Sequence, residues 1–210
     1  MRNLLDVRAL GAAALTLAVA YGAVGCGSDD DPTSTAAAPS ATEHNDADVA
    51  FASDMLQHHA QALSMVDLTL DRPLDPEVVE LAEQVRSAQG PEIETFTDWL
   101  TEWGEPIPET MRDHSNAGHG GHDVGDSMEG MDTDMPGMMS AEDMTGLQQA
   151  EDADFQAMWL EMMIEHHEGA VEMAEAHTDE GRYAPAIELA RDIAEGQTAE
   201  IAEMQRLLDS

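Results

Sequence analysis

Two pairs of adjacent histidines are the residues best suited to chemistry, because each pair lies between methionines at a fixed spacing. The pattern M-x-x-H-H-x5-M occurs twice, and its members are Met55, His58, His59, Met65, Met163, His166, His167 and Met173. Imidazole and thioether ligands together suit copper, with methionine favouring Cu(I) and histidine serving both oxidation states. Zinc or iron is less favoured, since neither cysteine nor an H-E-x-x-H or E-x-x-H arrangement accompanies the histidines. The alternative is structural: hydrogen-bonded core histidines beside a packed methionine stripe.

Three carboxylates are placed to support these histidines. Asp54 precedes His58 by one helical turn, and Glu92 and Glu200 lie on the apolar stripes of two later helical segments. A buried imidazole needs a partner for each ring nitrogen. We therefore expect these carboxylates to hold a histidine of the facing helix, to bind metal directly, or to orient the metal ligands.

A second set of ligands lies in residues 104–145, a segment rich in Gly, Asp, Met and His that we expect to be a loop or disordered. Nine soft or borderline ligands are expected to be exposed there: His114, His119, His122, Met128, Met131, Met135, Met138, Met139 and Met144. Exposed methionine oxidises readily outside the cell, which argues against a role as mere filler. We expect the segment to capture metal; the alternative is a low-complexity linker.

An internal repeat predicts the elements that position these residues. Shifted by 108 residues, the two halves align without a gap, with His58-His59 on His166-His167 and Glu92 on Glu200. Each copy is expected to form two helices, at about 46–70 and 76–103, and again at about 150–178 and 184–209. Short loops favour antiparallel hairpins, so the two hairpins predict an all-α four-helix bundle. We expect Gly90-Pro91 to interrupt and kink the second helix.

The helical period assigns each histidine to a face. At about 100° per residue, His58 and His166 fall on the apolar arc of their helices together with the flanking methionines. His59 and His167 fall on the flank of that arc. The sequence therefore predicts one buried histidine in each repeat and a second one at the edge of the core.

The charge of the chain excludes some partners. Its 210 residues include 44 acidic and 8 basic ones, for a formal net charge of -36, and every basic residue is arginine. Nucleic acid and anionic lipid surfaces are excluded as electrostatic partners, because binding them needs clustered cations. Such a chain attracts cations, although the charge also fits a merely soluble acidic surface.

The N-terminal residues are typical of an exported lipoprotein. A short charged start and an Ala-rich apolar run end at Ala23-Val24-Gly25-Cys26, and Cys26 is the only cysteine. We expect a signal peptide at 1–25, a lipidated Cys26 with a flexible tether at 26–45, hairpins at 46–103 and 146–210, and the linker at 104–145 between them. The alternative is an ordinary signal peptide or a retained anchor. The expected location is the bacterial cell envelope, on the outer face of the cytoplasmic membrane or in the periplasm.

The motifs together resemble a known family. MLQHHAQALSM and MMIEHHEGAVEMA, each followed by Q-x-x-E-I (Gln89–Ile93 and Gln197–Ile201), and the Met-Pro-Gly-Met-Met lead-in at 135–139 are similar to the domain of unknown function 305, or CopM-like, family. The resemblance implies a ferritin-like four-helix bundle and, for some members, copper binding and resistance outside the cytoplasm. It assigns ligand roles to the two histidine pairs and their flanking methionines. The first repeat departs from the usual pattern, with Gln-Ala-Leu-Ser in place of Gly-Ala-Ile/Val.

These observations lead to one principal functional hypothesis and two alternatives. The principal one is an extracytoplasmic lipoprotein that binds copper, or silver, for buffering, sequestration or resistance, and that exchanges metal with an unidentified protein. The first alternative is a ferritin-like metal oxidase, although the E-x-x-H motif of di-iron centres is missing at the histidine pairs. The second is a non-catalytic interaction module with structural histidines. An enzymatic role is the less favoured expectation.

Overall fold

The computed structural model describes residues 38–115 and 134–210. The expected signal peptide, the lipidated Cys26 and most of the tether lie outside the described residues. Four linker ligands also lie outside them: His119, His122, Met128 and Met131. His114 lies in a short helix, Met111–Ser115. The structure therefore describes the two hairpins and both ends of the linker.

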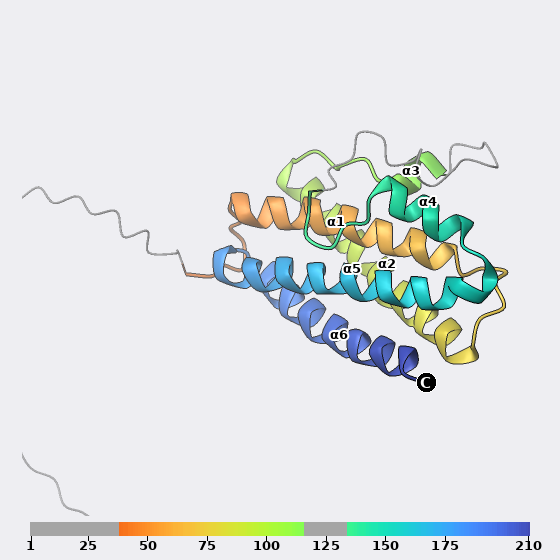
Figure 1. The fold of residues 1–210 in the computed structure, drawn as a ribbon. Coiled ribbons are helices and arrows are strands. Elements are labelled where there is room, and N and C mark those ends of the chain that lie inside the picture. The colour runs from red at the N-terminus through yellow and green to blue at the C-terminus, as the bar shows by residue number, and fades with distance from the viewer. Residues whose placement is uncertain (1–37, 116–133) are drawn as a thin grey trace, which may run out of the picture. The chain divides into compact units, whose positions relative to one another are not determined.

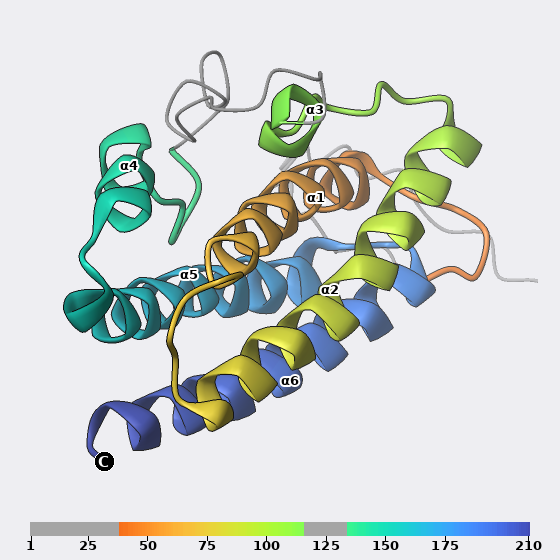
Figure 2. The same cartoon turned by 90° about the vertical axis from the view of Figure 1, so that its right-hand side faces the viewer.

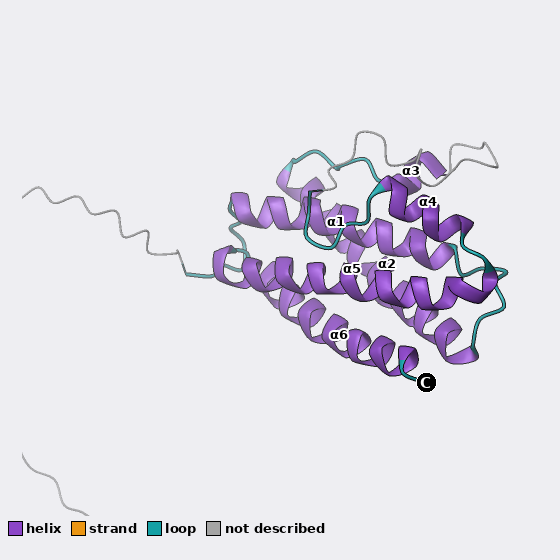
Figure 3. Cartoon of the chain, viewed as in Figure 1, coloured by secondary structure: helices purple, strands orange, loops and turns teal. Residues whose placement is uncertain are grey.

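Four long helices form a bundle: α1 (Asp46–Asp67), α2 (Pro76–Trp103), α5 (Asp152–Glu180) and α6 (Ala184–Leu208). α2 packs on α1 and α6 packs on α5, while α1 and α5 lie side by side and join the two hairpins (Figures 1 and 2). Two shorter helices, α3 (Met111–Ser115) and α4 (Ala141–Gln149), belong to the connection between the hairpins. Within the described residues the secondary structure is helical apart from one isolated bridge between Ser40 and Tyr183 (Figure 3). The predicted all-α four-helix bundle is confirmed.

The helix ends follow from local signals. Asn45 caps α1 in a reciprocal capping box with Asp48, and Pro76 occupies the first turn of α2, where its missing N–H costs nothing. α2 ends at Gly104, which adopts the left-handed conformation with φ 77°. α6 begins at Ala184, the counterpart of Pro76 at the same repeat offset. No helix among the described residues is long and apolar enough to cross a membrane.

The expected interruption at Gly90-Pro91 is wrong. α2 continues through both residues, and the Pro91 carbonyl accepts a hydrogen bond from the Thr95 hydroxyl. Proline removes one backbone donor, but the two ends of this 28-residue helix are held by buried side chains such as Leu81 and Leu100. Packing along the whole length outweighs the loss of one hydrogen bond.

The core is apolar towards both ends of the bundle and polar in the middle. On α5, Met163 belongs to one hydrophobic cluster and Ala170 to another. On α1 the order is reversed, because Leu56 belongs to the cluster of Ala170 and Ala62 to the cluster of Met163. Each histidine pair lies between two such residues in its helix. The four imidazoles of the two repeats therefore lie at the boundary between the two apolar clusters.

The expectation of a wholly exposed linker at 104–145 is also wrong. Met111, Met139 and Met144 are 2%, 4% and 0% exposed and belong to the apolar core. Ser140 and Asp143 form a capping box that starts α4, a sequence signal that the loop interpretation overlooked. Both ends of the linker thus pack on the bundle, because these methionines gain more by burial than the chain loses in freedom.

Candidate metal centre

All four paired histidines are completely buried, at 0% exposure. The rings of His58 and His166 are in contact across α1 and α5, with centroids 3.8 Å apart and planes tilted by 41°. This contact joins equivalent residues of the two repeats. His59 and His167, expected at the edge of the core, are equally buried, because each faces the neighbouring helix of its own hairpin.

Each repeat contains the same imidazole–carboxylate pair. His59 Nε2 lies 2.7 Å from Glu92 Oε2, and His167 Nε2 lies 2.9 Å from Glu200 Oε2. The side chains of Glu92 and Glu200 are 20% and 17% exposed, so each carboxylate connects a buried ring to the solvent. The expected contact between these glutamates and a histidine of the facing helix is present in both hairpins.

The end of the linker crosses the bundle directly over His58. His58 Nε2 donates to the Pro136 carbonyl at 3.0 Å. Pro136 and Gly137 are the central residues of a β-turn closed by Met138 N–H and Met135 O at 3.2 Å, and Gly137 has φ 71°. Proline followed by a residue with positive φ is typical of a type II turn. The turn places Met135 and Met138, both half-buried, at its two ends.

Two residues of different type, at equivalent positions of the two repeats, dock this turn. On α5, Gly169 has no side chain, and a Cβ there would lie 2.1 Å from Pro136 O. On α1, the equivalent residue is Gln61, which donates to Met139 O at 3.0 Å and accepts from Met139 N at 2.7 Å. The departure of the first repeat from the family pattern at Gln61 therefore has a structural reason: one helix needs space for the turn, and the other holds it.

Burial keeps the central imidazoles neutral. The pKa of His58 is lowered to about 3, mainly by burial and further by the neighbouring His59. Burial lowers the pKa of His166 well below its usual value, and His58 adds to the effect. Among the described residues, neither ring nitrogen of His166 makes a well-aligned hydrogen bond, although the ring contacts the backbone of His58. Nδ1 of His58, His59 and His167 has no hydrogen-bond partner there. Neutral rings with unpaired nitrogens in a core are the protonation state that binds metal.

The methionines of the motif surround this cluster in different ways. Met55 and Met163 are fully buried and precede His58 and His166 by one helical turn, so they share a face with these rings. Met65 is also fully buried and Met173 is half-buried. In the described part of the chain, no three His, Cys, Asp or Glu side chains converge as a ready metal site. A metal at His58 and His166 would therefore need thioether ligands in addition.

The sequence motifs did not single out His177, which lies in the same pocket as Asp54. Asp54 lines a pocket of about 200 Å³ together with Met173 and His177, whereas the Nε2 partner of His58 is the Pro136 carbonyl. His177 stacks on Phe51 at 4.1 Å between centroids. It follows His166 by three helical turns, a spacing that assigns both to one face and could have revealed it.

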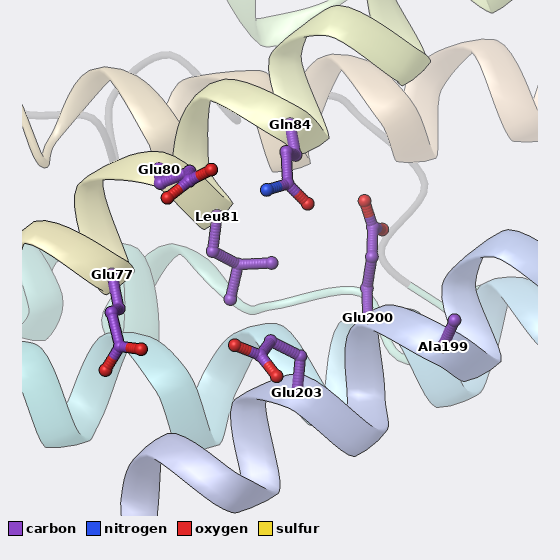
Figure 4. A pocket seen from close by; sticks show the side chains of 7 residues that line it. All are labelled: Glu77, Glu80, Leu81, Gln84, Ala199, Glu200 and Glu203. Atoms are coloured by element: carbon purple, nitrogen blue, oxygen red, sulfur yellow. The ribbon is translucent and has the colours of Figure 1, made fainter.

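An acidic groove reaches the second imidazole–carboxylate pair from the surface. The groove has a volume of about 370 Å³ between α2 and α6, and Figure 4 shows its lining side chains. Glu77 and Glu203 are bridged by Arg206 at its margin. Glu200 also lines the groove, and the same carboxylate holds His167. Solvent cations thus have a negatively charged approach to the edge of the core.

Several known proteins share this arrangement of helices. A DUF305 fragment from Deinococcus radiodurans is 28% identical, covers 79% of this chain and 97% of its own, and superposes with a TM-score of 0.63. A DUF305 protein from Streptomyces coelicolor is 31% identical, with coverage of 78% and 92% and a TM-score of 0.63. CopM in its Cu(I)-bound form is 25% identical, with coverage of 77% and 95% and a TM-score of 0.57.

A family model supports the same assignment from sequence. The model of the domain of unknown function DUF305 matches residues 48–208, which include both hairpins and the linker. No curated protein is similar to the chain at the level of these matches. Because the family model spans most of the sequence and the solved DUF305 structures share its fold, the chain belongs to the DUF305 family.

Proposed function

We propose that this protein binds copper ions, and silver in the same site, as cargo at the histidine cluster in the middle of the bundle. His58 and His166 supply the imidazole nitrogens, and Met55 and Met163 supply thioethers from the preceding turns. His59 and His167 complete the cluster through their Nδ1 atoms, while Glu92 and Glu200 hold the opposite ring nitrogens. A carboxylate behind a metal-bound imidazole fixes its tautomer and orientation.

One observation carries this proposal: His166 is fully buried, and among the described residues its ring nitrogens make no well-aligned hydrogen bond, only a contact with the backbone of His58. A buried polar group without a partner costs about 1–3 kcal/mol, so a purely structural histidine would be expected to have one. The ring instead contacts His58, its counterpart from the other repeat. Two neutral imidazoles together with thioethers are a ligand set that favours Cu(I) over zinc.

The structural relatives support the choice of metal. CopM has been solved in Cu(I)-, Cu(II)- and Ag-bound forms, and it is 25–26% identical to this chain. Thioether and imidazole ligands suit all three ions, since silver resembles Cu(I) in its softness. The acidic surface supports a role in concentrating cations near the bundle.

The remaining linker ligands extend the proposal beyond the core. Met135 and Met138 flank the turn over His58, where their thioethers offer a transfer point between the surface and the cluster. The other proposed capture ligands are His114, His119, His122, Met128 and Met131. Met139 is removed from the capture set, because it is 4% exposed and packed in the core. In this role the protein buffers or sequesters copper and exchanges the metal with a partner.

A competition titration tests the core site. The full-length chain in mild detergent is titrated with Cu(I) against a chromophoric chelator, and then with Ag(I). The expected result is tight stoichiometric binding that falls at least tenfold in affinity in a His58→Gln/His166→Gln variant. His44→Gln is the matched control, because His44 stacks on Trp103 outside the cluster. Equal binding by the wild type and the double variant would refute the core site.

The linker is tested separately by substitution. Deleting all of 111–144 would remove buried Met111 and Met139 and damage the core. We instead replace His119 and His122 by Gln, and Met128 and Met131 by Leu. Slower loading with unchanged final stoichiometry is the result expected for a capture segment. Unchanged loading rates would eliminate that role.

The location is also part of the proposal: an extracytoplasmic lipoprotein attached through Cys26. Wild-type protein expressed in bacteria should incorporate radiolabelled fatty acid and fractionate with membranes. The Cys26→Ser variant should lose the label. Label retained by this variant, or absent from the wild type, would contradict lipidation at Cys26 while leaving the copper proposal untouched.

A further inference from the structure

A small polar cavity lies between α2 and α6, on the side of Glu92 and Glu200 that faces away from the histidine cluster, and the copper proposal leaves the cavity itself unused. Its volume is about 40 Å³; Gln89, Glu92, Gln197 and Glu200 line it, and the exposed Asp192 lies at its margin. Each repeat contributes one glutamine and one glutamate, at equivalent positions three residues apart. The cavity therefore lies between the two hairpins, and each hairpin contributes one glutamine and one glutamate to its lining.

The two glutamines are buried without adequate partners. Gln89 is 1% exposed and Gln197 is 4% exposed. Among the described residues, neither polar atom of the Gln89 amide has a hydrogen-bond partner, and neither does Oε1 of Gln197. Both side chains line the cavity. Such unpaired amides are rare in native cores and indicate that a polar ligand occupies the space between them.

The two glutamates supply charge at the same place. Each uses Oε2 to hold a buried histidine, which leaves Oε1 for another ligand. Figure 4 shows the Glu200 side chain rising from α6 toward α2. A carboxylate held through one oxygen by a buried N–H donor is oriented in the manner common for metal-binding carboxylates.

We propose that this cavity binds one hard divalent cation, Ca²⁺ or Mg²⁺ by chemical class, through the carboxylates of Glu92 and Glu200 and the amide oxygens of Gln89 and Gln197. Oxygen ligands suit hard cations, and two carboxylates balance a double positive charge. The volume admits one ion with water. The cation ties α2 to α6. The site lacks thioethers, and the proposal does not depend on the copper function.

The response of thermal stability to Ca²⁺ and Mg²⁺ tests the site. The melting temperature of the full-length wild type is measured in EDTA, and then with each cation alone, against NaCl at matched ionic strength to account for general screening. A saturable rise of about 5 °C or more is expected at a hundredfold excess over Kd. Calorimetric titration of the wild type with Ca²⁺ should resolve one site above weak surface binding. A response no larger than that to NaCl means that the cavity holds only water, and overturns the proposal.

A double variant separates a cation site from an ordinary polar interface. Gln89→Leu/Gln197→Leu removes the amide oxygens and leaves both glutamate–histidine pairs intact. Because the unpaired amides are gone, this variant should melt higher than the wild type in EDTA and lose the cation response. Gln84→Leu, at an exposed position of α2, should keep that response. A double variant that responds to Ca²⁺ like the wild type refutes the assignment. Its Cu(I) stoichiometry should be unchanged, so failure of this proposal and failure of the copper proposal are distinguishable.

Discussion

Replacing Gly169 by alanine should displace the Pro136–Gly137 turn from α5 and destabilise the bundle. An added Cβ would lie 2.1 Å from Pro136 O, 2.3 Å from Pro136 C and 2.6 Å from Gly137 Cα. All three are backbone atoms, so the clash cannot be relieved by rotating a side chain. The turn is also held on its other side, by His58 at Pro136 and by Gln61 at Met139. Relief therefore requires the whole turn to move.

The magnitude follows from opposing effects. Alanine gains about 1 kcal/mol over glycine in helix propensity. Over-packing costs about 1–3 kcal/mol. If the turn detaches instead, the burial of Met139 is lost, worth about 1.5–3 kcal/mol, together with two hydrogen bonds to Gln61 of about 1 kcal/mol each. A net loss of about 2 kcal/mol is expected, which lowers the melting temperature of a chain of this size by about 4–8 °C.

Thermal unfolding followed by circular dichroism measures this effect, with Gly196→Ala as the matched control. Gly196 lies inside α6, and an added Cβ there meets no atom within 4 Å. The control should therefore gain about 1 kcal/mol and melt about 2–4 °C higher. The two glycine-to-alanine changes are expected to shift the melting temperature in opposite directions. A stabilised Gly169→Ala protein would refute the docking of the turn.

Two further predictions concern pH and the Gln61 contact. The folded chain keeps His58 neutral down to a pKa of about 3, whereas the unfolded chain takes up a proton near pH 6.5. Unfolding therefore becomes easier as pH falls, and His58 alone should cost about 2 kcal/mol between pH 6.5 and 5. Gln61→Leu leaves Met139 N–H and C=O buried without partners and should cost about 2–4 kcal/mol in urea unfolding.

Controls distinguish these effects from general damage. The His58→Gln/His166→Gln variant should lose most of the pH slope; wild-type stability that is constant between pH 7 and 5 would show that these rings are not buried neutral. Gln57→Leu, on the same helix as Gln61 and only half-buried, should change stability by less than about 0.5 kcal/mol. If Gln57→Leu and Gln61→Leu change the free energy of unfolding equally, the contact between Gln61 and Met139 does not stabilise the fold.

The parts of the structure that repeat in sequence were predictable. The helical period and the constant offset between the halves placed His58 and His166 on buried faces and led to the His59–Glu92 and His167–Glu200 contacts. Both signals are local or duplicated, so one sequence is enough to read them. The approach of two imidazoles to 3.8 Å between centroids depends on how α1 and α5 pack, which the period alone does not determine.

The linker contacts were harder to predict, because they occur only once in the chain and follow no periodic sequence pattern. The turn at Pro136 reaches His58 through a single hydrogen bond between residues far apart in sequence. Composition favoured a loop there, since Gly and Pro recur in the segment and are common in flexible chains. Two signals were nevertheless present: the Ser140–Asp143 capping box, and the exchange of Gly169 for Gln61 between the repeats.

X-ray absorption at the copper edge of the Cu(I)-loaded chain tests the central claim most directly. Copper is predicted to be bound by both imidazole nitrogen and thioether sulfur, and the imidazole scattering should fall in the His58→Gln/His166→Gln variant, which keeps only His59 and His167 of the paired histidines. The Met55→Leu/Met163→Leu variant should lose sulfur scattering instead. A copper environment of oxygen alone, or one that both variants leave unchanged, would contradict a metal centre at the paired histidines.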